Sequence, residues 1–290
     1  MKLSVVTPSY NQAAFLEETL RSVISQREFV HEYFVLDGGS DDGSVDIIRR
    51  YEQHLDFWVS EPDKGQCDAI HRGFSRCTGD VIYWINSDDV LLPGALEKVH
   101  AAYDADPSLD VVSGWGVAID GGGRIIKMKR PVHDSPWWGR LGYLRVNQPC
   151  TFFRRDLYEK VGGLDLDLHC VLDTELWYRM FRAGSKWGGI DDYVAAFRLH
   201  DEAKGSVLQQ RYKQERAILK EKYPDLVDRK MRHALVMILY YTAQLTSGRT
   251  FSSMADMRRH HGRALVEVFG DWEIGEDRVK ASRPTESAGA

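Results

Sequence analysis

The first hundred residues alternate between two hydrophobic periods, and this alternation limits the fold more than any other feature of the sequence. Apolar residues recur at helical spacing in two segments, for example at Leu16, Leu20 and Val23. Pro93 marks the first turn of a third helix, over 93–105. Short apolar runs typical of buried strands separate these segments, at residues 3–8, 32–37, 56–61 and 80–85. Strands that alternate with helices predict right-handed crossovers and an α/β fold with a mostly parallel central sheet flanked by helices.

Polar residues follow each of these four strands at the point where the strand ends. They are Thr7 to Asn11, Asp37 to Ser40, Glu61 to Gln66, and Asn86 to Asp89. Parallel strands of such a sheet present their carboxyl ends at one edge, which is where open α/β sheets bind ligands. The sequence therefore predicts one ligand site at this edge.

The second half of the chain has a different pattern. Residues 110–130 read as two strands around a Gly-rich turn. A strand over 150–155, a helix over 173–184 and a strand over 193–200 follow, and then helices over 204–223, 226–247 and 251–269. We expect an α/β domain over 1–205, a helical extension over 206–275 and a disordered polar tail over 276–290.

The composition argues against several classes of function. The 38 Lys and Arg residues against 43 Asp and Glu give a net charge of −5, and no long basic run favours nucleic-acid binding. The four cysteines show no CxxC spacing, so buried structural thiols are favoured over zinc ligands. The start of the chain, MKLSVVTPSYNQ, reaches polar residues too early for a signal peptide. A cytoplasmic location is expected.

The longest apolar segment, residues 234–245, is too short to span a membrane. Its length favours a helix buried in the protein core. The alternative is an interfacial helix that rests on anionic lipid, because Arg229, Lys230, Arg232 and His233 precede it. Peripheral contact with the inner face of a membrane thus stays open.

The adjacent carboxylates Asp88 and Asp89 follow the fourth strand and would repel each other without a cation. A divalent ion between protein and phosphate explains them, because magnesium-like ions take one or two carboxylates and complete their shell with phosphate and water. Successive side chains of a strand alternate in direction, so one is expected to bind the metal and the other a neighbouring group such as a ribose hydroxyl. The alternative is that one of them caps the helix at Pro93.

Three further residues have a functional and a structural interpretation each. Asp37 can accept hydrogen bonds from a base or ribose, or can belong to the turn of "GGSDDGS". Lys64 can counter a phosphate, or can be a solvated loop residue. Asp173 can act as a general base near an acceptor hydroxyl, or can cap the helix that it opens.

The segments "VVTPSYNQAAFLEETLRSVISQ", "VLDGGSDDGSVDII", "EPDKGQCDAI" and "GDVIYWINSDD" together resemble family 2 of the glycosyltransferases, inverting enzymes with the GT-A fold. The resemblance continues more loosely through "QPCTFFRR", "GGLD", "LDTELWYRM" and "FRLH", and so covers about residues 1–205. Four motifs in the family's order make it far more specific than one acidic pair.

The resemblance implies roles at matching positions. The nucleotide sugar would be bound by Pro8, Tyr10, Asp37, Asp63, Lys64, Gln66 and Asp88, with Asp37 at the base and Asp88 at the ribose. A divalent metal, Mn²⁺ or Mg²⁺, would be bound by Asp89 and His200, and Asp173 would be the catalytic base.

The chain departs from the family's pattern at three places. His71 stands where the family often has Asn, and the base motif reads Leu172-Asp173 instead of Glu-Asp, with Glu175 as a rival base. After His200 the next serine is as far away as Ser206.

These implications amount to an inverting transferase that moves a sugar from a nucleotide-diphosphate donor, UDP favoured, to a hydroxyl of a glycan or lipid-linked acceptor. Polysaccharide or O-antigen synthesis is the expected setting. Trp115, Trp137 and Trp138 can line the acceptor site or pack in the core. The alternative function is a degenerate scaffold that binds a nucleotide sugar without transfer. A dinucleotide oxidoreductase is disfavoured, because Thr7 to Tyr10 lacks a G-x-G-x-x-G turn.

Overall fold

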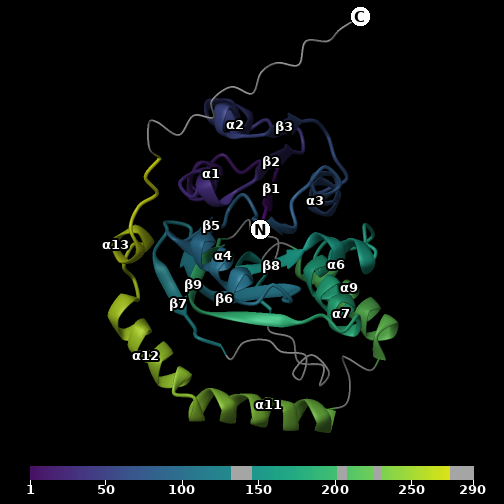
Figure 1. Cartoon of the computed structure of the whole chain (residues 1–290), viewed down its shortest axis with the longest axis vertical. Coiled ribbons are helices and arrows are strands. Elements are labelled where there is room, and N and C mark those ends of the chain that lie inside the picture. The colour runs from purple at the N-terminus through teal and green to yellow at the C-terminus, as the bar shows by residue number, and fades with distance from the viewer. Residues whose placement is uncertain (132–145, 201–207, 225–229, 275–290) are drawn as a thin grey trace, which may run out of the picture.

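The computed structural model describes residues 1–131, 146–200, 208–224 and 230–274. Its strands are β1 (Leu3–Ser9), β2 (Glu32–Asp37), β3 (Phe57–Ser60), β4 (Val81–Trp84), β5 (Val90–Leu91), β6 (Val111–Asp120), β7 (Ile125–Met128), β8 (Thr151–Arg154) and β9 (Trp187–Leu199). In this part of the chain they form one nine-stranded sheet in the order β3-β2-β1-β4-β8-β6-β9-β5, and β7 pairs with β6 (Figure 1).

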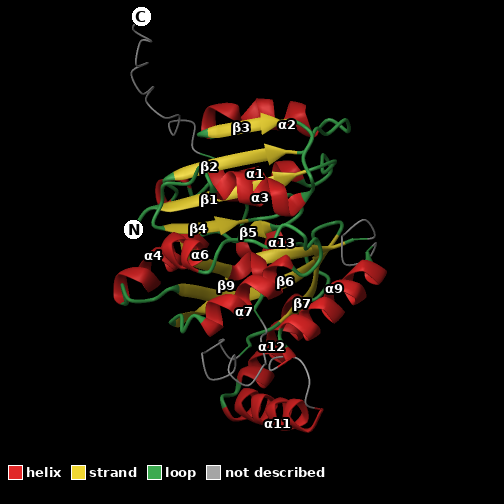
Figure 2. Cartoon of the chain, turned by 90° about the vertical axis from the view of Figure 1, so that its right-hand side faces the viewer, coloured by secondary structure: helices red, strands yellow, loops and turns green. Residues whose placement is uncertain are grey.

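The helices lie on both faces of this sheet. They are α1 (Leu16–Ile24), α2 (Ser44–Tyr51), α3 (Gln66–Phe74), α4 (Ala95–Ala105), α6 (Arg155–Lys160), α7 (Leu172–Arg182), α9 (Gln209–Lys222), α11 (Lys230–Thr246), α12 (Arg249–His260) and α13 (Leu265–Phe269). One apolar cluster packs α1, α2 and α4 on one face, and a second packs α3, α6, α7 and α9 on the other. Figure 2 shows the strands between these layers.

The four predicted strands of the first half are confirmed as parallel neighbours. Their side chains alternate between the two apolar clusters, with Val5 and Tyr83 in one and Val6 and Trp84 in the other. Because both faces are covered by helices, these strands are mostly apolar on both sides, and the polar Ser4 and Thr7 of β1 are buried as well. All four end at the same edge, which can be followed from the arrowheads in Figure 2.

The sheet is less parallel than the sequence predicted. Strand β8 is antiparallel to both of its neighbours, β4 and β6, and β5 is antiparallel to β9. The two predicted strands around a Gly-rich turn are confirmed as β6 and β7. The α/β class is therefore correct, and the second half makes the sheet mixed.

Strand β9 begins at Trp187, six residues before the predicted start at 193. Gly188 and Gly189, which precede the predicted strand, pair with Val112 and Ser113 of β6. A Cβ atom at Gly188 would lie 2.6 Å from a methyl carbon of Leu109, so the strand needs a residue without a side chain there. The short elements β5 and α6 were not predicted.

The predicted helix over 251–269 is wrong as one element, because the chain forms α12 and α13 instead. Gly262 has φ +78° and donates its N–H to the carbonyl of Ile125, and Ile125 donates to the carbonyl of Arg263. This short segment adds to the free edge of β7, and a helix cannot continue through that pairing.

Helix α11 corrects the interpretation of residues 234–245 as a core helix. Ile238 is 63% exposed and Leu245 52%, while Tyr240 is buried. From residue 237 on, where its side chains are described, the helix therefore lies on the surface with Tyr240 packed inward. No described helix is long and apolar enough to cross a membrane.

Helix α9 belongs by its packing to the sheet domain. Leu219 and Tyr223 are buried in the apolar cluster that also holds Leu176 and Trp177 of α7. The boundary at 205/206 thus stays a prediction, and the first helix after it shares the core of the domain before it. The predicted tail, 276–290, lies outside the described residues.

The interpretation of the cysteines as structural thiols agrees with their burial. Cys67, Cys77 and Cys150 are buried and Cys170 is half-buried, each as a thiol outside a disulfide. Burial raises the pKa of the Cys77 thiol to about 12, which keeps it protonated and unreactive.

Candidate active site

The loops after β1, β2 and β3 meet at Gly38. A Cβ atom at this position would lie 3.0 Å from Oδ2 of Asp63 and 3.2 Å from a ring carbon of Tyr10. Tyr10 is 62% exposed, whereas Pro8 is buried in β1 opposite Leu36. Tyr10 and Asp63, two residues predicted to bind the nucleotide sugar, are therefore adjacent to a backbone position that has no side chain.

Asp37 is buried and holds the turn that follows it. Its carboxylate accepts hydrogen bonds from the backbone N–H groups of Gly39 and Ser40 and from the hydroxyls of Ser40 and Ser60. The structural interpretation of Asp37 therefore has direct support. A role at the base stays a prediction, which these contacts do not exclude because Oδ1 accepts only the hydroxyl of Ser40 and keeps a second lone pair.

The loop after β4 is tied to the start of α3 through Asn86. The side-chain amide of Gln66 donates to Oδ1 of Asn86 at 2.6 Å, and Nδ2 of Asn86 donates to Oδ2 of Asp89 at 3.0 Å. Gln148 accepts from the same Asn86 amide and donates to the carbonyl of Trp84. Lys64, two residues before Gln66, is exposed.

Asp89 is 5% exposed and lies between β9 and α1. Its Oδ1 atom accepts the backbone N–H of Arg198 in β9 at 3.0 Å, and its carbonyl accepts the hydroxyl of Thr19 in α1 at 2.7 Å. Burial, and then the neighbouring charge of Asp88, raise the pKa of Asp89 well above its usual value. The side chain is held in one orientation.

Asp88 faces the end of β9. Its Oδ2 atom lies 3.1 Å from Nε2 of His200, and its side chain is 21% exposed. The prediction grouped His200 with Asp89, whereas the structure joins it to Asp88. Neither carboxylate caps the next helix, because α4 begins after Gly94 without a side-chain cap. The capping interpretation of the pair is therefore wrong.

Arg198 is a residue of this site that sequence reasoning missed. Its guanidinium donates to the carbonyls of Asp88, Asp120 and Gly121, pairs with Glu18 and lies over the ring of Phe15. A signal was present, since Arg198 and His200 are two apart in a strand and so point to the same side. Gln148 was also missed, and Asn86 was predicted at this edge without its contacts, because Gln148 and Gln66 come from distant segments.

The donors at this edge fit a divalent cation that is shared with a phosphate. The described residues contain no group of three or more His, Cys, Asp or Glu side chains placed to hold an ion by themselves. Magnesium-like ions do not need one, because they commonly use one or two carboxylates, water and phosphate oxygens. Asp88 and Asp89, with His200 beside Asp88, can supply the protein ligands of such a site.

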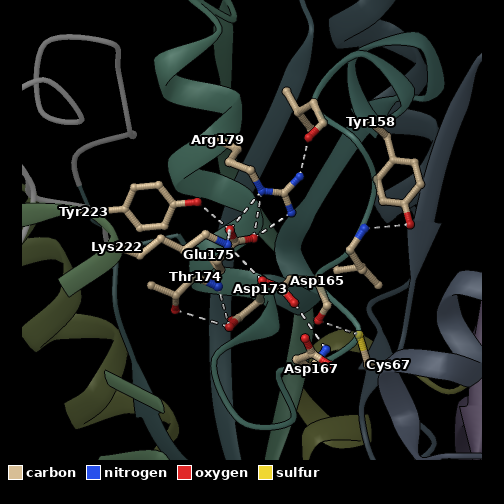
Figure 3. A network of polar contacts seen from close by, with 12 residues as sticks. Cys67, Tyr158, Asp165, Asp167, Asp173, Thr174, Glu175, Arg179, Lys222 and Tyr223 are labelled. Carbon is tan, nitrogen blue, oxygen red and sulfur yellow. Dashed lines mark hydrogen bonds and ion pairs between the residues drawn. The ribbon is translucent and has the colours of Figure 1, made fainter. Parts of the chain in front are cut away.

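The two candidate bases, Asp173 and Glu175, lie in different surroundings (Figure 3). Asp173 accepts from the N–H and hydroxyl of Thr174, and no other side-chain contact of Asp173 is seen among the described residues. Burial raises the pKa of its carboxyl, although the residue as a whole is only half-buried. It is not the cap of α7, which begins after Val171 without a side-chain cap.

Glu175 is fully buried, and its carboxylate accepts hydrogen bonds from three side chains. It accepts from Arg179 at 2.6 Å, from Nζ of Lys222 at 3.0 Å and from the hydroxyl of Tyr223 at 2.6 Å. Burial by itself would raise the pKa of Glu175, but hydrogen bonds from Arg179, Tyr223 and Lys222 outweigh it and lower the pKa. A carboxylate whose anionic form is stabilised in this way is a poor base, so the structure favours Asp173.

The segment before Asp173 lies against the loop after β3, which contains Asp63, Lys64 and Gly65. A Cβ atom at Gly65 would lie 3.5 Å from Nδ1 of His169. Glu215 of α9 fixes this segment, since its carboxylate accepts the backbone N–H groups of His169, Cys170 and Val171 at 2.7–3.2 Å. Helix α9 thereby sets the entry to α7, which carries Asp173.

The tryptophans predicted as acceptor-site candidates divide into two groups. Trp115 is 5% exposed and packs between the guanidinium groups of Arg130 and Arg249 and the ring of Tyr193. Ordinary core packing is therefore the correct interpretation for Trp115. Trp137 and Trp138 lie outside the described residues.

Comparison with known proteins identifies the family. Residues 4–172, more than half of the chain, match the family model described as glycosyl transferase family 2. An uncharacterized glycosyltransferase of Mycobacterium tuberculosis is 32% identical over 179 residues, which are 61% of this chain and 68% of that protein. The putative teichuronic acid biosynthesis glycosyltransferase TuaG of Bacillus subtilis is 32% identical over 99 residues, which are 33% of this chain and 39% of that protein.

Two solved structures share the fold at low sequence identity. TarS of S. aureus, in complex with UDP-GlcNAc, has a TM-score of 0.63 and 18% identity over 86% of this chain and 74% of that one. The mannosyltransferase PcManGT of Pyrobaculum calidifontis, in complex with GDP-Man and Mn²⁺, has a TM-score of 0.56 and 20% identity over 89% and 75%. With its α/β sheet of the GT-A type and its match over residues 4–172, this chain belongs to glycosyltransferase family 2 and is a glycosyltransferase.

Proposed function

We propose that this glycosyltransferase moves a sugar from a nucleotide-diphosphate donor to an acceptor hydroxyl by one metal-assisted displacement that inverts the anomeric centre. The observation that carries the proposal is the fixed acidic loop after β4. Asn86 and Arg198 hold Asp89 from two sides, and Asp88 is left partly exposed beside His200. Such a preorganised pair of carboxylates suits a cation–diphosphate complex.

The donor nucleoside is assigned to the loops around Gly38, with Pro8, Tyr10, Asp37 and Asp63 as its residues. The exposed ring of Tyr10 beside Asp63 supports this assignment, because a base can stack on the ring while a carboxylate accepts from its polar edge. Gln66 and the exposed Lys64 follow on the next loop, where the ammonium group can counter a phosphate. UDP is our first choice, since TarS was solved with UDP-GlcNAc, and GDP is the rival, since PcManGT was solved with GDP-Man.

Gly38→Ala is expected to weaken nucleotide binding by roughly tenfold, since its Cβ would push Asp63 and Tyr10 apart by contacts of 3.0 and 3.2 Å. The measurement is the nucleotide dissociation constant by calorimetry. Gly122→Ala in the β6–β7 turn is the matched control, because its Cβ would meet Asp120 at an ordinary 3.5 Å. Unchanged affinity in Gly38→Ala would remove this loop from the donor site.

Metal binding is assigned to Asp89 and His200, and ribose binding to Asp88. When bound, a divalent ion neutralises charge on the departing diphosphate. The chain's own part is to fix the carboxylates: Arg198 and Asn86 orient Asp89, and His200 keeps Asp88 at the same place. The presence of Mn²⁺ in the PcManGT complex supports the assignment.

Asp173 is assigned as the base that takes the proton from the acceptor hydroxyl. The hydroxyl oxygen forms the new bond to the anomeric carbon, and the diphosphate leaves from the opposite face with its electron pair. No covalent sugar–protein intermediate is needed. The raised pKa of Asp173 supports this role, because a base is more effective when its pKa lies nearer to the working pH.

The acceptor is assigned to the hydroxyls of a cell-surface glycan or of its lipid-linked precursor, as in polysaccharide or O-antigen synthesis. The relative TuaG, a putative teichuronic acid biosynthesis glycosyltransferase, supports this class. Donor sugars of this kind are cytoplasmic metabolites, so we place the reaction in the cytoplasm.

Thermal unfolding with UDP, GDP and dTDP, each with and without Mn²⁺, tests the proposal. A nucleotide at a hundred times its dissociation constant should raise the unfolding midpoint by about 5 °C. The rise should require Mn²⁺ and should be lost in Asp89→Asn and reduced in Asp88→Asn. A folded protein that responds to none of the nucleotides would contradict the donor assignment. Nucleotide binding without any donor turnover would favour the scaffold alternative.

A further inference from the structure

Helices α11 and α12 each present exposed apolar side chains at helical spacing. On α11 the outward positions include Ile238, Tyr241 and Leu245, which are 63%, 50% and 52% exposed and recur at intervals of three and four residues. On α12 they are continued by Phe251 and Met254, which are 64% and 49% exposed. We call these five residues the outer apolar row. In Figure 1 the two helices lie at the border of the molecule, away from β1 and β2.

The opposite sides of both helices are fixed to the sheet domain, so the direction of the outer apolar row is set. On α11, Tyr240 is buried and Gln244 donates to the carbonyl of Arg130. On α12, Asp256 accepts two hydrogen bonds from Arg130 at 2.7 and 2.9 Å and one from the hydroxyl of Tyr193. Ser253 accepts the backbone N–H of Arg130.

The exposed charges on α12 itself are basic, although the exposed Asp191 of β9 pairs with Arg249 near the start of this helix. None of the exposed residues that the structure describes between 237 and 260 is acidic, although the whole chain has a net charge of −5. Arg258 is exposed one turn beyond Met254 on the same side of α12, and Arg259 is exposed next to it. The single acid of α12, Asp256, is on the packed side with Arg130.

An anionic lipid surface matches both features. Amphipathic helices with apolar and basic residues on the outward side lie in the plane of the membrane interface, with their apolar residues among the acyl chains and their cations at the headgroups. Neither helix is long and apolar enough to cross the membrane. A second copy of the chain fits less well, because a symmetric contact would bring together two patches whose own exposed charges on α12 are all basic.

We propose that the outer apolar row, with Arg258 and Arg259, docks the enzyme on an anionic membrane surface. The surface shares no residue with the proposed donor site or with Asp173, so the inference does not rest on the proposed reaction.

Co-sedimentation with vesicles tests the docking surface. The wild type is expected to sediment with vesicles that contain equal parts of phosphatidylglycerol and phosphatidylcholine, and to stay in solution with phosphatidylcholine alone. The double variant Leu245→Glu/Phe251→Glu should lose vesicle binding. Arg258→Glu/Arg259→Glu should weaken it at least tenfold, and added salt should weaken wild-type binding.

Two matched controls separate the surface from a general change of charge. Ile218→Glu places the same change at a 52% exposed apolar residue of α9, and Arg49→Glu/Arg50→Glu reverses two exposed arginines of α2. Both controls should bind vesicles like the wild type, and every variant should keep its nucleotide-dependent thermal shift. Absence of wild-type binding to anionic vesicles, or equal loss in variants and controls, would overturn the proposal. A dimer in light scattering that Leu245→Glu/Phe251→Glu dissociates would do the same and would assign the surface to a second copy.

Discussion

Asp173→Asn is expected to slow glycosyl transfer by about 10²–10⁴-fold, the usual contribution of a positioned general base. The amide keeps the size of the carboxylate and its contact with Thr174, but cannot take a proton. Affinity for the donor nucleotide should stay within about twofold of wild type, because no residue of the proposed donor site bonds to Asp173 in the described structure. The measurement is single-turnover transfer at saturating donor, alongside the nucleotide dissociation constant.

The pH dependence of transfer provides an independent check of Asp173. A base must be deprotonated to act, so the rate should fall as the pH drops through the pKa of Asp173. Burial raises that pKa, so the fall should be centred above the value of about 3.9 typical of an ordinary aspartate. Asp167→Asn, an exposed carboxylate on the preceding loop, is the control and should keep the wild-type rate and profile. Wild-type transfer by Asp173→Asn would exclude Asp173 as the base.

Glu175→Gln should affect stability instead, lowering the free energy of unfolding by roughly 3 kcal/mol, the lower end for breaking a buried ion pair. The amide leaves Arg179 and Lys222 without their buried counter-charge, while Lys222, whose side chain is 44% exposed, recovers part of the loss through solvent. Urea unfolding of both proteins measures the difference. The catalytic rate of the folded variant should change far less than that of Asp173→Asn.

The effect of Glu175 also has a defined pH window. Because the pKa of Glu175 is lowered in the folded protein, its stabilisation is complete above the ordinary glutamate pKa of about 4.3 and is lost as the pH falls through the lowered value. Glu159→Gln is the matched control, since Arg155 and Glu159 of α6 form a solvent-exposed pair with the same spacing. It should cost no more than about 1 kcal/mol. Equal costs at the two positions would show that the cluster around Glu175 contributes nothing special.

These two carboxylates show where sequence reasoning reaches its limit. From the sequence, Asp173 and Glu175 are two acids in the first turn of one helix, and either could be the base. Their difference comes from Lys222 and Tyr223, almost fifty residues later, and from Arg179 on the next turn. Only the packing of α9 against α7 decides that Glu175 accepts hydrogen bonds from three side chains, whereas Asp173 accepts them from Thr174 alone among the described residues.

The sequence by itself determined the first half of the fold and the edge at which the site lies. Strands β1 to β4 are apolar on both faces and end in turn residues, and both signals are local: hydrophobic period and backbone preference act within a few residues. The position of Tyr10, Asp37, Asp63 and Asp88 after those strands follows from the parallel arrangement alone.

The tertiary structure decided what depends on partners far apart in the chain. The sequence could not show that Arg198 holds Asp89, that His200 meets Asp88, or that Gly188 lies inside a strand. It also could not place Ile238 on the surface, because an apolar helix has the same composition whether protein or another medium covers it. Burial and long-range hydrogen bonds are properties of the assembled layers, and no short window of residues contains them.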